Sequence, residues 1–359
     1  MKKLIAVLCA CFVLGACDKP DSDKPIIIIG ASLPLTGNMA HIGGGVKNSL
    51  QMALDEWNKK DTKFKYKLLV EDDAFEAKKV ASIVNKFVNV DHAKAVFTVF
   101  SIGANVASPI AQNGHVIHMT CAYGSQPANG FYNFNNITQY DNQTDLMLKE
   151  LNKRGIKSIA LLVSNNIGST QQADILKQKI KQDKTIKIIG KEIFNPGTKD
   201  FKMIIEKILS QGTPDIFYVD GITPDANLIA KYLKEMTGKI TLTTINDFIE
   251  TPERKNFEGL WFVESASGTD EFNEKYEKMY GDQVYLCGAN MYDNLNLLID
   301  AYEHSETQNV DNDAVVEKLL TVKNQEGAIG TFSIDNDGII QSNANIKVIK
   351  NGKSVLIKE

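Results

Sequence analysis

Small polar residues follow several apolar, β-branched segments of this sequence. They stand at Ser101, at Asp220-Gly221 and at Asn246-Asp247, and the run from Thr120 to Ser125 occupies the same kind of position. Hydroxyl, amide and carboxylate groups of this kind hold a small molecule through hydrogen bonds and ionic contacts, and they rarely catalyse alone. We therefore expect a binding site that is assembled from several distant segments.

The sequence lacks the common patterns of catalysis and cofactor binding. The glycines Gly43 to Gly45 do not have the G-x-G-x-x-G spacing of a dinucleotide site, because Asn48 stands at the third position. There is no G-x-S-x-G motif and no P-loop. His115 and His118 would point to opposite faces of a short strand, which does not suit a shared metal ion. We expect a protein that is not an enzyme and that needs no cofactor or metal.

The chain is mildly acidic, with 40 Lys and Arg against 44 Asp and Glu and a formal charge of −4. This balance argues against a nucleic-acid partner. Three of the acids, Glu71 to Asp73, stand together after an apolar segment. They suit either a cation site or the N-terminus of the following helix, and we expect the helix because its dipole favours negative charge there.

Strand-like and helix-like segments alternate over the first two thirds of the chain. The apolar run of Ile26 to Ile29 is typical of a strand buried on both faces. The predicted strands are 26–33, 65–71, 94–99, 115–119, 157–163, 185–192, 214–219 and 240–244. The predicted helices between them are 44–58, 76–89, 103–112, 143–154, 168–182, 199–211 and 225–236. This alternation predicts two similar α/β halves, each with a parallel sheet.

The last third has a different pattern. It begins with a short strand at 259–264 and continues with helices at 269–280, 286–304 and 312–321. The closing segments, including 327–334 and 344–350, alternate polar and apolar residues and predict an antiparallel meander. If these helices cover the first half, the chain crosses between halves more than once. That path predicts a cleft between two lobes and a hinge of several segments.

The N-terminus has the layout of a secretory signal, with Lys2 and Lys3 before an apolar run from Leu4 to Leu14. The run is too short to span a membrane permanently. Leu14 to Cys17 resembles a bacterial lipobox, which predicts a signal peptide at 1–16, a lipidated Cys17 and a polar tether at 17–25. The alternative is an ordinary signal peptide in which this cysteine is incidental.

Two cysteines remain once the signal peptide and Cys17 are set aside. Cys121 and Cys287 could pair in an oxidising compartment, but the sequence does not bring their Cα atoms together. We therefore expect free, partly buried thiols.

Several motifs, in order along the chain, resemble a known family. They are LPLTGNMAHIG at 33–43, VEDDAFEAKKVAS at 70–82, NPGTKDF at 195–201, PDIFYVDG at 214–221, ANMYDNLNLLIDAYE at 289–303 and GAIGTFSIDNDG at 327–338. Their order and spacing are similar to those of type I periplasmic solute-binding proteins of the leucine/isoleucine/valine-binding group. The resemblance implies two Rossmann-like lobes with parallel sheets, joined by three crossovers. The first lobe would comprise 26–138 plus 265–333, and the second 139–264 plus 334–359.

The resemblance also implies particular ligand contacts. Ser101 matches the serine that holds an amino-acid carboxylate in this family, and Asp247 stands where an acid holds the ammonium group. Ile42, with Thr36 and His41, would lie on the cleft wall after the first strand. The loop after the fourth strand, with Tyr123, would contribute Ala122 and either Gly124 or Ser125.

Some positions depart from the family pattern. Phe97 and Phe100 replace a usual glycine and serine, Ile167 replaces an aromatic residue, and Gly124 stands where a threonine is common. Asp220 is an additional acid near Asp247. The pair would favour a cationic or amine-bearing ligand, unless Asp220 caps the helix that starts near residue 224.

The resemblance implies a lipoprotein at the periplasmic face of the inner membrane. It would capture a small polar solute, an amino acid or related amide, and deliver it to the permease of an ABC importer. The alternative is a membrane-tethered ligand sensor with the same fold that reports to a regulatory partner.

Overall fold

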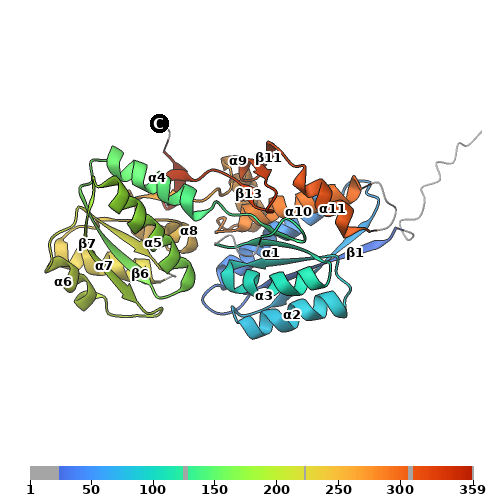
Figure 1. Cartoon of the computed structure of the whole chain (residues 1–359), viewed down its shortest axis with the longest axis horizontal. Coiled ribbons are helices and arrows are strands. Elements are labelled where there is room, and N and C mark those ends of the chain that lie inside the picture. The colour runs from blue at the N-terminus through green and yellow to red at the C-terminus, as the bar shows by residue number, and fades with distance from the viewer. Residues whose placement is uncertain (1–23, 124–127, 222–223, 306–309, 358–359) are drawn as a thin grey trace, which may run out of the picture.

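The computed structural model describes residues 24–123, 128–221, 224–305 and 310–357, which form two α/β lobes side by side (Figure 1). The predicted signal peptide, Cys17, Gly124 and Ser125 lie outside the described residues. Among the described helices, none combines the length and the apolar character that a membrane crossing requires.

The sheet of the first lobe has five parallel strands in the order β2-β1-β3-β4-β5. The strands are β1 (Ile26–Leu33), β2 (Lys65–Asp72), β3 (Ala95–Val99), β4 (Ile117–Cys121) and β5 (Asn133–Asn135). The helices of this lobe are α1 (Ala40–Trp57), α2 (Ala77–Asn89), α3 (Phe100–Asn113), α9 (Asp270–Tyr280), α10 (Gly288–Glu303) and α11 (Asn312–Leu320). Because β2 and β3 lie on opposite sides of β1, the strand order reverses there, and such a point is where open α/β sheets bind ligands.

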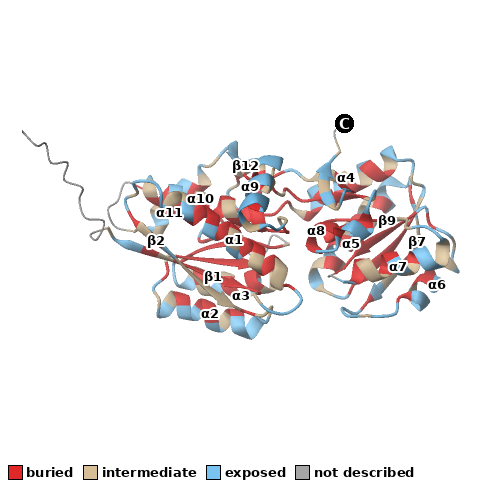
Figure 2. Cartoon of the chain, turned by 180° about the vertical axis from the view of Figure 1, so that it is seen from behind, coloured by how far each residue is buried: buried red, intermediate tan, exposed pale blue. Residues whose placement is uncertain are grey.

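The isoleucine run of β1 has layers of helices on both sides. Ile26 is 63% exposed at the start of the strand, whereas Ile27 and Ile29 are fully buried in the core that includes α1 and α10. Ile28 points to the opposite face and packs against the cluster formed by α2 and α3. The prediction of a strand covered on both faces is therefore confirmed from Ile27 onward (Figure 2).

The second lobe repeats this plan with four parallel strands in the order β7-β6-β8-β9. The strands are β6 (Ser158–Ser164), β7 (Lys187–Phe194), β8 (Ile216–Asp220) and β9 (Leu242–Thr244). The helices are α4 (Tyr140–Lys153), α5 (Ile167–Asp183), α6 (Lys202–Leu209), α7 (Asp225–Thr237) and the short α8 (Asp247–Glu250), followed by the 3₁₀-helix η2 (Arg254–Phe257). Alternate residues of β6 enter different clusters, as the two-residue period of a strand requires.

Three crossovers join the lobes within the described residues. They run from β5 to α4, from β10 (Trp261–Glu264) to α9, and from β13 (Ile340–Gln341) to β14 (Asn345–Lys350). The Thr138 hydroxyl binds all three, because it accepts from the Ala266 amide at 2.9 Å and pairs with the Ser342 hydroxyl at 3.0 Å. The prediction of two Rossmann-like lobes with parallel sheets is confirmed.

The C-terminal strands differ from the prediction of one meander. β11 (Gln325–Gly327), β12 (Gly330–Ile334) and β13 form one antiparallel sheet, while β14 and β15 (Lys353–Leu356) pair with β10. Ile339 also bridges to Asn135. Residues 339–341 therefore pair with the first lobe, although the sequence led us to expect them in the second.

The glycine run lies inside a helix, not in a loop before it. α1 begins at Ala40, and a side chain at Gly43 would overlap the backbone of Pro34. Glycine is needed there because the loop after β1 crosses directly over the helix. This close crossing explains the glycine at position 43. The predicted start of the helix at residue 44 was therefore four residues too late.

The expectation of free thiols is wrong, because Cys121 and Cys287 form a disulfide with their Cα atoms 5.8 Å apart. Cys121 ends β4, and Cys287 precedes α10, which packs on the same sheet. The two positions are 166 residues apart in the chain, so only the folded lobe brings them together.

The expectation that residues 71–73 cap the next helix is also wrong. The residue before α2 is Glu76, whose side chain makes no cap bond. Asp72 instead accepts the amides of Leu35 and Ala74, both at 2.8 Å, and Asp73 accepts the amide of Phe75 at 2.8 Å. These carboxylates hold two loops at the carboxyl edge of the sheet.

Candidate functional site

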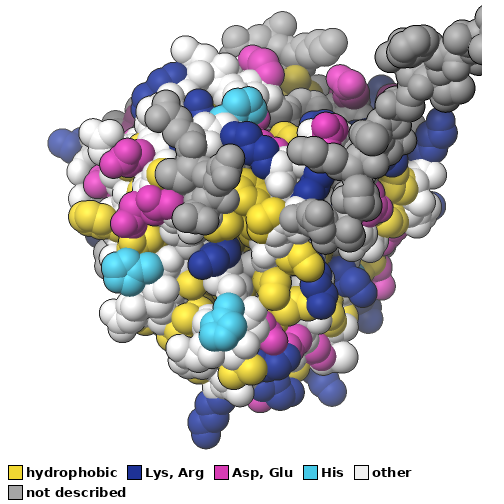
Figure 3. Space-filling view, turned by 90° about the vertical axis from the view of Figure 1, so that its right-hand side faces the viewer, with side chains coloured by type: hydrophobic (Ala, Val, Ile, Leu, Met, Phe, Trp, Pro, Cys, Tyr) yellow, Lys and Arg dark blue, Asp and Glu magenta, His cyan; other side chains and the backbone are white. Residues whose placement is uncertain are grey.

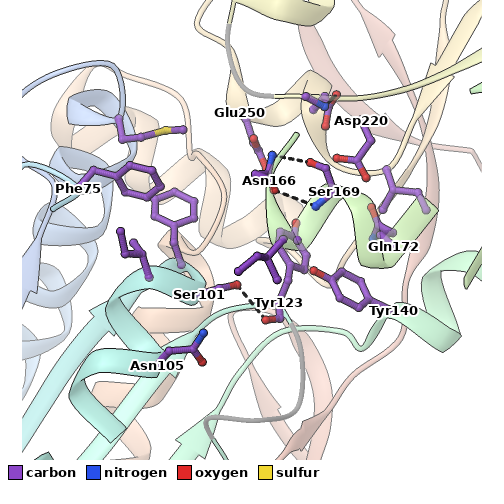
Figure 4. A pocket seen from close by; sticks show the side chains of 18 of the residues that line it. Phe75, Ser101, Asn105, Tyr123, Tyr140, Asn166, Ser169, Gln172, Asp220 and Glu250 are labelled. Carbon is purple, nitrogen blue, oxygen red and sulfur yellow. Dashed lines mark hydrogen bonds between the residues drawn. The ribbon is translucent and has the colours of Figure 1, made fainter. Parts of the chain in front are cut away.

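A cavity of about 500 Å³ lies between the lobes at the carboxyl ends of both sheets (Figure 4). The first lobe contributes Met39, Phe75, Phe100, Ser101, Ile102, Asn105, Val106 and Tyr123. The second contributes Tyr140, Asn166, Ile167, Gly168, Ser169, Gln172, Asp220, Gly221, Ile245, Asp247 and Glu250. A cavity of this size suits a small molecule.

The wall from the first lobe is mainly apolar and aromatic. The rings of Phe75 and Phe100 meet edge to face, with centroids 5.5 Å apart. Both residues have a positive φ, 62° and 61°, which costs energy for a side chain of this size and which is concentrated at functional sites. Phe100 starts α3, so this backbone turn brings its ring to the cleft.

One polar end of the cavity lies at the N-terminus of α3. The Ser101 hydroxyl donates to the carbonyl of Tyr123 at 3.0 Å, which joins the helix to the loop after β4. The residue before the helix, Val99, provides no side-chain cap. The first amides of α3 can therefore bind an anionic group, which the helix dipole also favours.

Two tyrosines stack between this end and the acidic residues of the second lobe, whose charges act on both phenols. Tyr123 follows β4 and Tyr140 begins α4, and their rings are 5.4 Å apart and nearly parallel, at 14°. Neither hydroxyl has a hydrogen-bond partner among the described residues. Burial raises the pKa of both phenols, so both remain protonated and can donate to a ligand.

The opposite end carries three carboxylates. Asp220 ends β8 and is hydrogen-bonded to the Tyr218 hydroxyl at 3.0 Å, and Asp247 accepts the Gly221 amide at 2.9 Å. Glu250 follows Asp247 by three residues in α8, and this spacing places both on one face of the helical turn. No hydrogen bond to the Glu250 carboxylate is present among the described residues, and this residue is only 8% exposed.

Burial shifts the titration of these carboxylates. It raises the pKa of Asp220 to about 6, and burial together with the charge of Asp220 raises the pKa of Glu250 to about 8. Burial and the two neighbouring acids also raise the pKa of Asp247. No Lys, Arg or His is among the described residues that line the cavity. The described lining residues thus provide no positive partner for the acidic end.

The N-terminus of α5 completes the wall of the second lobe. Asn166 caps this helix by accepting the Ser169 amide at 2.9 Å, and it donates to the Ser169 hydroxyl at 2.9 Å. Gln172, one turn later, accepts from Tyr218 and donates to Gln143, so its orientation is fixed. These residues form a polar floor beside Asp220.

Six of the predicted site residues line the cavity. They are Phe100, Ser101, Tyr123, Ile167, Asp220 and Asp247. Ile167 is 69% exposed and therefore lies at the mouth. The residue that precedes α7 is Pro224, and Asp220 bonds to Tyr218, so the alternative of Asp220 as the cap of that helix is not supported.

Other predicted residues lie elsewhere. Both backbone groups of Ala122 bond to the Asn135 side chain, at 3.0 and 2.8 Å, so they are not directed to a ligand. Ile42 is fully buried beside Met39. Thr36 bonds to Asp72, and His41 Nε2 lies 2.6 Å from the Glu250 carbonyl oxygen in the other lobe.

The sequence reasoning missed several lining residues. Glu250 had a signal, because its i, i+3 spacing to Asp247 matches one face of a helix. Asn166 and Ser169 had the spacing of a helix cap. Phe75 gave no signal, because its direction depends on a loop held by Asp73.

Comparison with known proteins gives the family. The sequence pattern of a family described as periplasmic binding protein matches residues 26–353. A Leu/Ile/Val-binding protein, BraC3, of Rhizobium johnstonii is 29% identical over 251 residues, which cover 67% of this chain and 66% of that protein. The alignment thus spans slightly less than two thirds of this relative's length.

Solved structures show the same fold. The substrate-binding protein LivJ of a branched-chain amino acid transporter from Streptococcus pneumoniae, in complex with isoleucine, has a TM-score of 0.83 and 20% identity. The match covers 93% of this chain and all of that one. A solute-binding protein of an ABC transporter from Rhodopseudomonas palustris, in complex with 3,4-dihydroxybenzoic acid, has a TM-score of 0.81, 17% identity and coverages of 93% and 96%.

These observations agree with the cleft and the two sheets described above. The motifs quoted from the sequence lie within the matched range, and the predicted resemblance is confirmed. The chain belongs to the family of type I periplasmic binding proteins that includes the Leu/Ile/Val-binding proteins.

Proposed function

We propose that this protein is an extracytoplasmic lipoprotein that captures a small polar solute between its lobes and delivers it to an ABC importer. The observation that carries the proposal is the cavity at the carboxyl ends of both sheets, which has hydrogen-bond donors at one end and carboxylates at the other. Two relatives of known structure are described as solute-binding proteins of transporters. We propose that the protein binds this solute and releases it chemically unchanged.

The two polar ends suit an amino acid or a related amide. On binding, the Ser101 hydroxyl would turn from the Tyr123 carbonyl to donate to a carboxylate or carbonyl oxygen of the ligand, which the first amides of α3 would also bind. An ammonium group would bind Asp247, whose carboxylate is positioned by the Gly221 amide. Charge-assisted hydrogen bonds at both ends would hold the two lobes together around the ligand.

The hinge gives such a ligand a way to act on the whole molecule. Because the lobes are joined by three crossovers, they can rotate relative to one another without unfolding. A ligand that contacts both walls favours the closed arrangement by its additional contacts there. The permease would then distinguish the loaded protein from the empty one.

Attachment to the membrane is proposed from the sequence Leu14 to Cys17, which resembles a lipobox. Lipidation of Cys17 would place the protein at the periplasmic face of the inner membrane, close to the permease. Radioactive palmitate labelling of the expressed full-length chain tests this step, and Cys17→Ser should abolish the label.

Ligand binding is tested by a thermal-shift screen of the chain from residue 18 onward, with amino acids, amides, polyamines and ureas. A ligand present at about 100 times its dissociation constant should stabilise the folded protein by about 2.7 kcal/mol. Failure of every solute class to raise the melting temperature would contradict the proposal. Solute uptake by cells that lack this protein separates transport from the sensor alternative.

Two substitutions test the predicted contacts. Ser101→Ala and Asp247→Asn should each weaken binding of the identified solute by about 1.5–3 kcal/mol, because each removes a charge-assisted hydrogen bond. Isothermal calorimetry measures the affinities. Glu235→Gln, on the exposed face of α7, is the matched control and should bind normally. Unchanged affinity in both site variants would refute the assignment of these contacts.

A further inference from the structure

The acidic end of the cavity contains more carboxyl groups than one ammonium group can bind. We propose that the ligand carries two cationic nitrogens, as do diamines and amino acids with a basic side chain, and that Asp220, Asp247 and Glu250 bind them. This inference rests on the proposed function, because it names the class of solute that the same cavity takes. It narrows the general expectation of an amino acid or amide.

The charge balance is the first argument. Three carboxylates line the second-lobe wall, and no basic side chain is among the described lining residues. Arg254 follows Glu250 by four residues, but its guanidinium donates to the carbonyls of Ile249 and Val284, both at 2.7 Å, and it lies outside the lining. A neutral zwitterion would supply one ammonium group and leave two buried carboxyl groups without a cationic partner, whereas a second cationic nitrogen would stabilise a further carboxylate in a closed site.

Unsatisfied polar groups are the second, independent argument. Glu250 is 8% exposed and accepts no hydrogen bond from the described residues. The Tyr140 hydroxyl also lacks a partner among them, although this residue is only 7% exposed. Both residues line the cavity (Figure 4). Buried polar groups without partners indicate the place of a ligand's own donors and acceptors.

The arrangement of the carboxylates provides two positions for cations. The Gly221 amide connects the end of β8 to Asp247, so Asp220 and Asp247 stand on neighbouring chain segments. Glu250 lies one helical turn beyond Asp247. One ammonium group can bind between the aspartates and a second beside Glu250, where the faces of the stacked Tyr123 and Tyr140 also attract a cation.

The rest of the ligand is then placed by the first lobe. Phe75 and Phe100 provide an apolar surface for a methylene chain, and Ser101 with the α3 amides accommodates a carboxylate if the ligand has one. A diamine would use only the apolar surface, whereas a basic amino acid would use both. Both kinds of ligand would bind the carboxyl groups of the acidic end through their cationic nitrogens.

Isothermal calorimetry with defined probes tests the inference. We expect lysine, ornithine and 1,4-diaminobutane to bind at least about tenfold more tightly than leucine or Nε-acetyllysine at pH 7.5. Nε-Acetyllysine is the control, because it keeps the α-amino acid group and the methylene chain of lysine and has a neutral amide in place of the second charge. If lysine and the diamine bind equally, the carboxylate of lysine adds nothing through Ser101 and the α3 amides. The inference is still supported in that case, because both ligands carry two cationic nitrogens.

Variants locate the effect. Glu250→Gln and Asp220→Asn should reduce the affinity for lysine or diaminobutane by at least about tenfold and should narrow the difference from Nε-acetyllysine. Thermal unfolding of each variant verifies that it is folded, and Glu235→Gln should match the unaltered protein.

The outcomes distinguish this inference from the proposed function. Tight binding of leucine or of a neutral amide, with weak binding of every dication, would overturn the inference and leave the solute-binding function intact. Binding of no solute at all would overturn both. Equal affinity for lysine and Nε-acetyllysine would also overturn the inference.

Discussion

At the scale of single residues, Glu250 is a buried carboxyl group in the wall of the cavity. The Asp220 and Asp247 carboxylates, the Tyr123 and Tyr140 phenols and Glu250 share the cavity, while His41 contacts the Glu250 backbone and Arg254 is bonded to other carbonyls. Burial raises the pKa of Glu250 from 4.5 to about 8. Ionisation of this side chain therefore opposes folding of the empty protein.

The raised pKa of Glu250 makes the free energy of unfolding depend on pH. Since the pKa of Glu250 is higher in the folded chain, the stability present below about pH 4.5 is lost as the pH rises through about 8. Glu250→Gln should stabilise the empty protein at pH 8.5 by about 1–3 kcal/mol, because it removes an unpaired buried charge. Its stability should also vary less between pH 5.5 and 8.5.

Urea unfolding at pH 5.5, 7.0 and 8.5 measures this effect in the unaltered protein and the variant. Glu235→Gln is the control, since it removes an exposed carboxylate. Parallel stability curves for Glu250→Gln and the unaltered chain would show that Glu250 ionises as easily in the fold as in water.

The sequence predicted only part of this site. Ser101, Asp220 and Asp247 were predicted because each lies within a few residues of the carboxyl end of a strand, where parallel sheets bind ligands. Glu250 and Tyr140 were missed, because their directions depend on where the short α8 begins and on α4 starting at Tyr140. Ala122 was placed correctly along the chain, but Asn135 from β5 occupies its backbone groups.

At the scale of elements, the disulfide secures the loop that carries Tyr123. Cys121 stands two residues before Tyr123, and its bond to Cys287 fixes the end of β4 to the start of α10. Cys287→Ser should lower the free energy of unfolding by about 2–4 kcal/mol, because the unfolded chain regains freedom over a long loop. Ligand affinity should fall as well, since the Tyr123 carbonyl positions Ser101.

Denaturant unfolding with and without reductant measures the contribution of the disulfide. The unaltered protein in strong reductant should unfold like Cys287→Ser in either condition. Identical curves for the oxidised and reduced unaltered protein would mean that the bond adds nothing to stability.

The hinge provides a second prediction at this scale. Thr138→Val removes the hydroxyl that accepts from the Ala266 amide and pairs with Ser342, so all three crossovers lose a contact. Because a buried amide is left without its acceptor, we expect a loss of about 1–3 kcal/mol in unfolding free energy. Thr138→Ser keeps the hydroxyl and is the matched control. Equal stability of the two variants in urea would argue against this role.

The elements themselves were largely predictable, for physical reasons. A buried parallel strand needs an apolar run such as Ile26 to Ile29, and the helices that cover it need one apolar face. β5 has only three residues, and its hydrogen bonds depend on β4, so the local sequence gave little signal. The pairing of Cys121 with Cys287 depends on how α10 returns to the first lobe, which no local pattern specifies.

At the scale of the whole molecule, the chain path places the cavity between the two lobes, at the carboxyl ends of their sheets. The lobes are in contact at His41 and Glu250 and at the stacked Tyr123 and Tyr140. Positive and negative side chains are interspersed on the end of the first lobe in Figure 3. Inside the cavity, by contrast, three carboxyl groups of the second lobe line one wall and no basic side chain is among the described lining residues.

The central claim is that a small solute binds between the lobes. The most direct measurement is a crystal structure of the protein with the solute that gives the largest thermal shift. We expect the ligand within hydrogen-bond distance of Ser101 in the first lobe and of Asp247 in the second. A ligand bound to one lobe alone, or in the separate cavity lined by Arg254 and Lys347, would contradict the account.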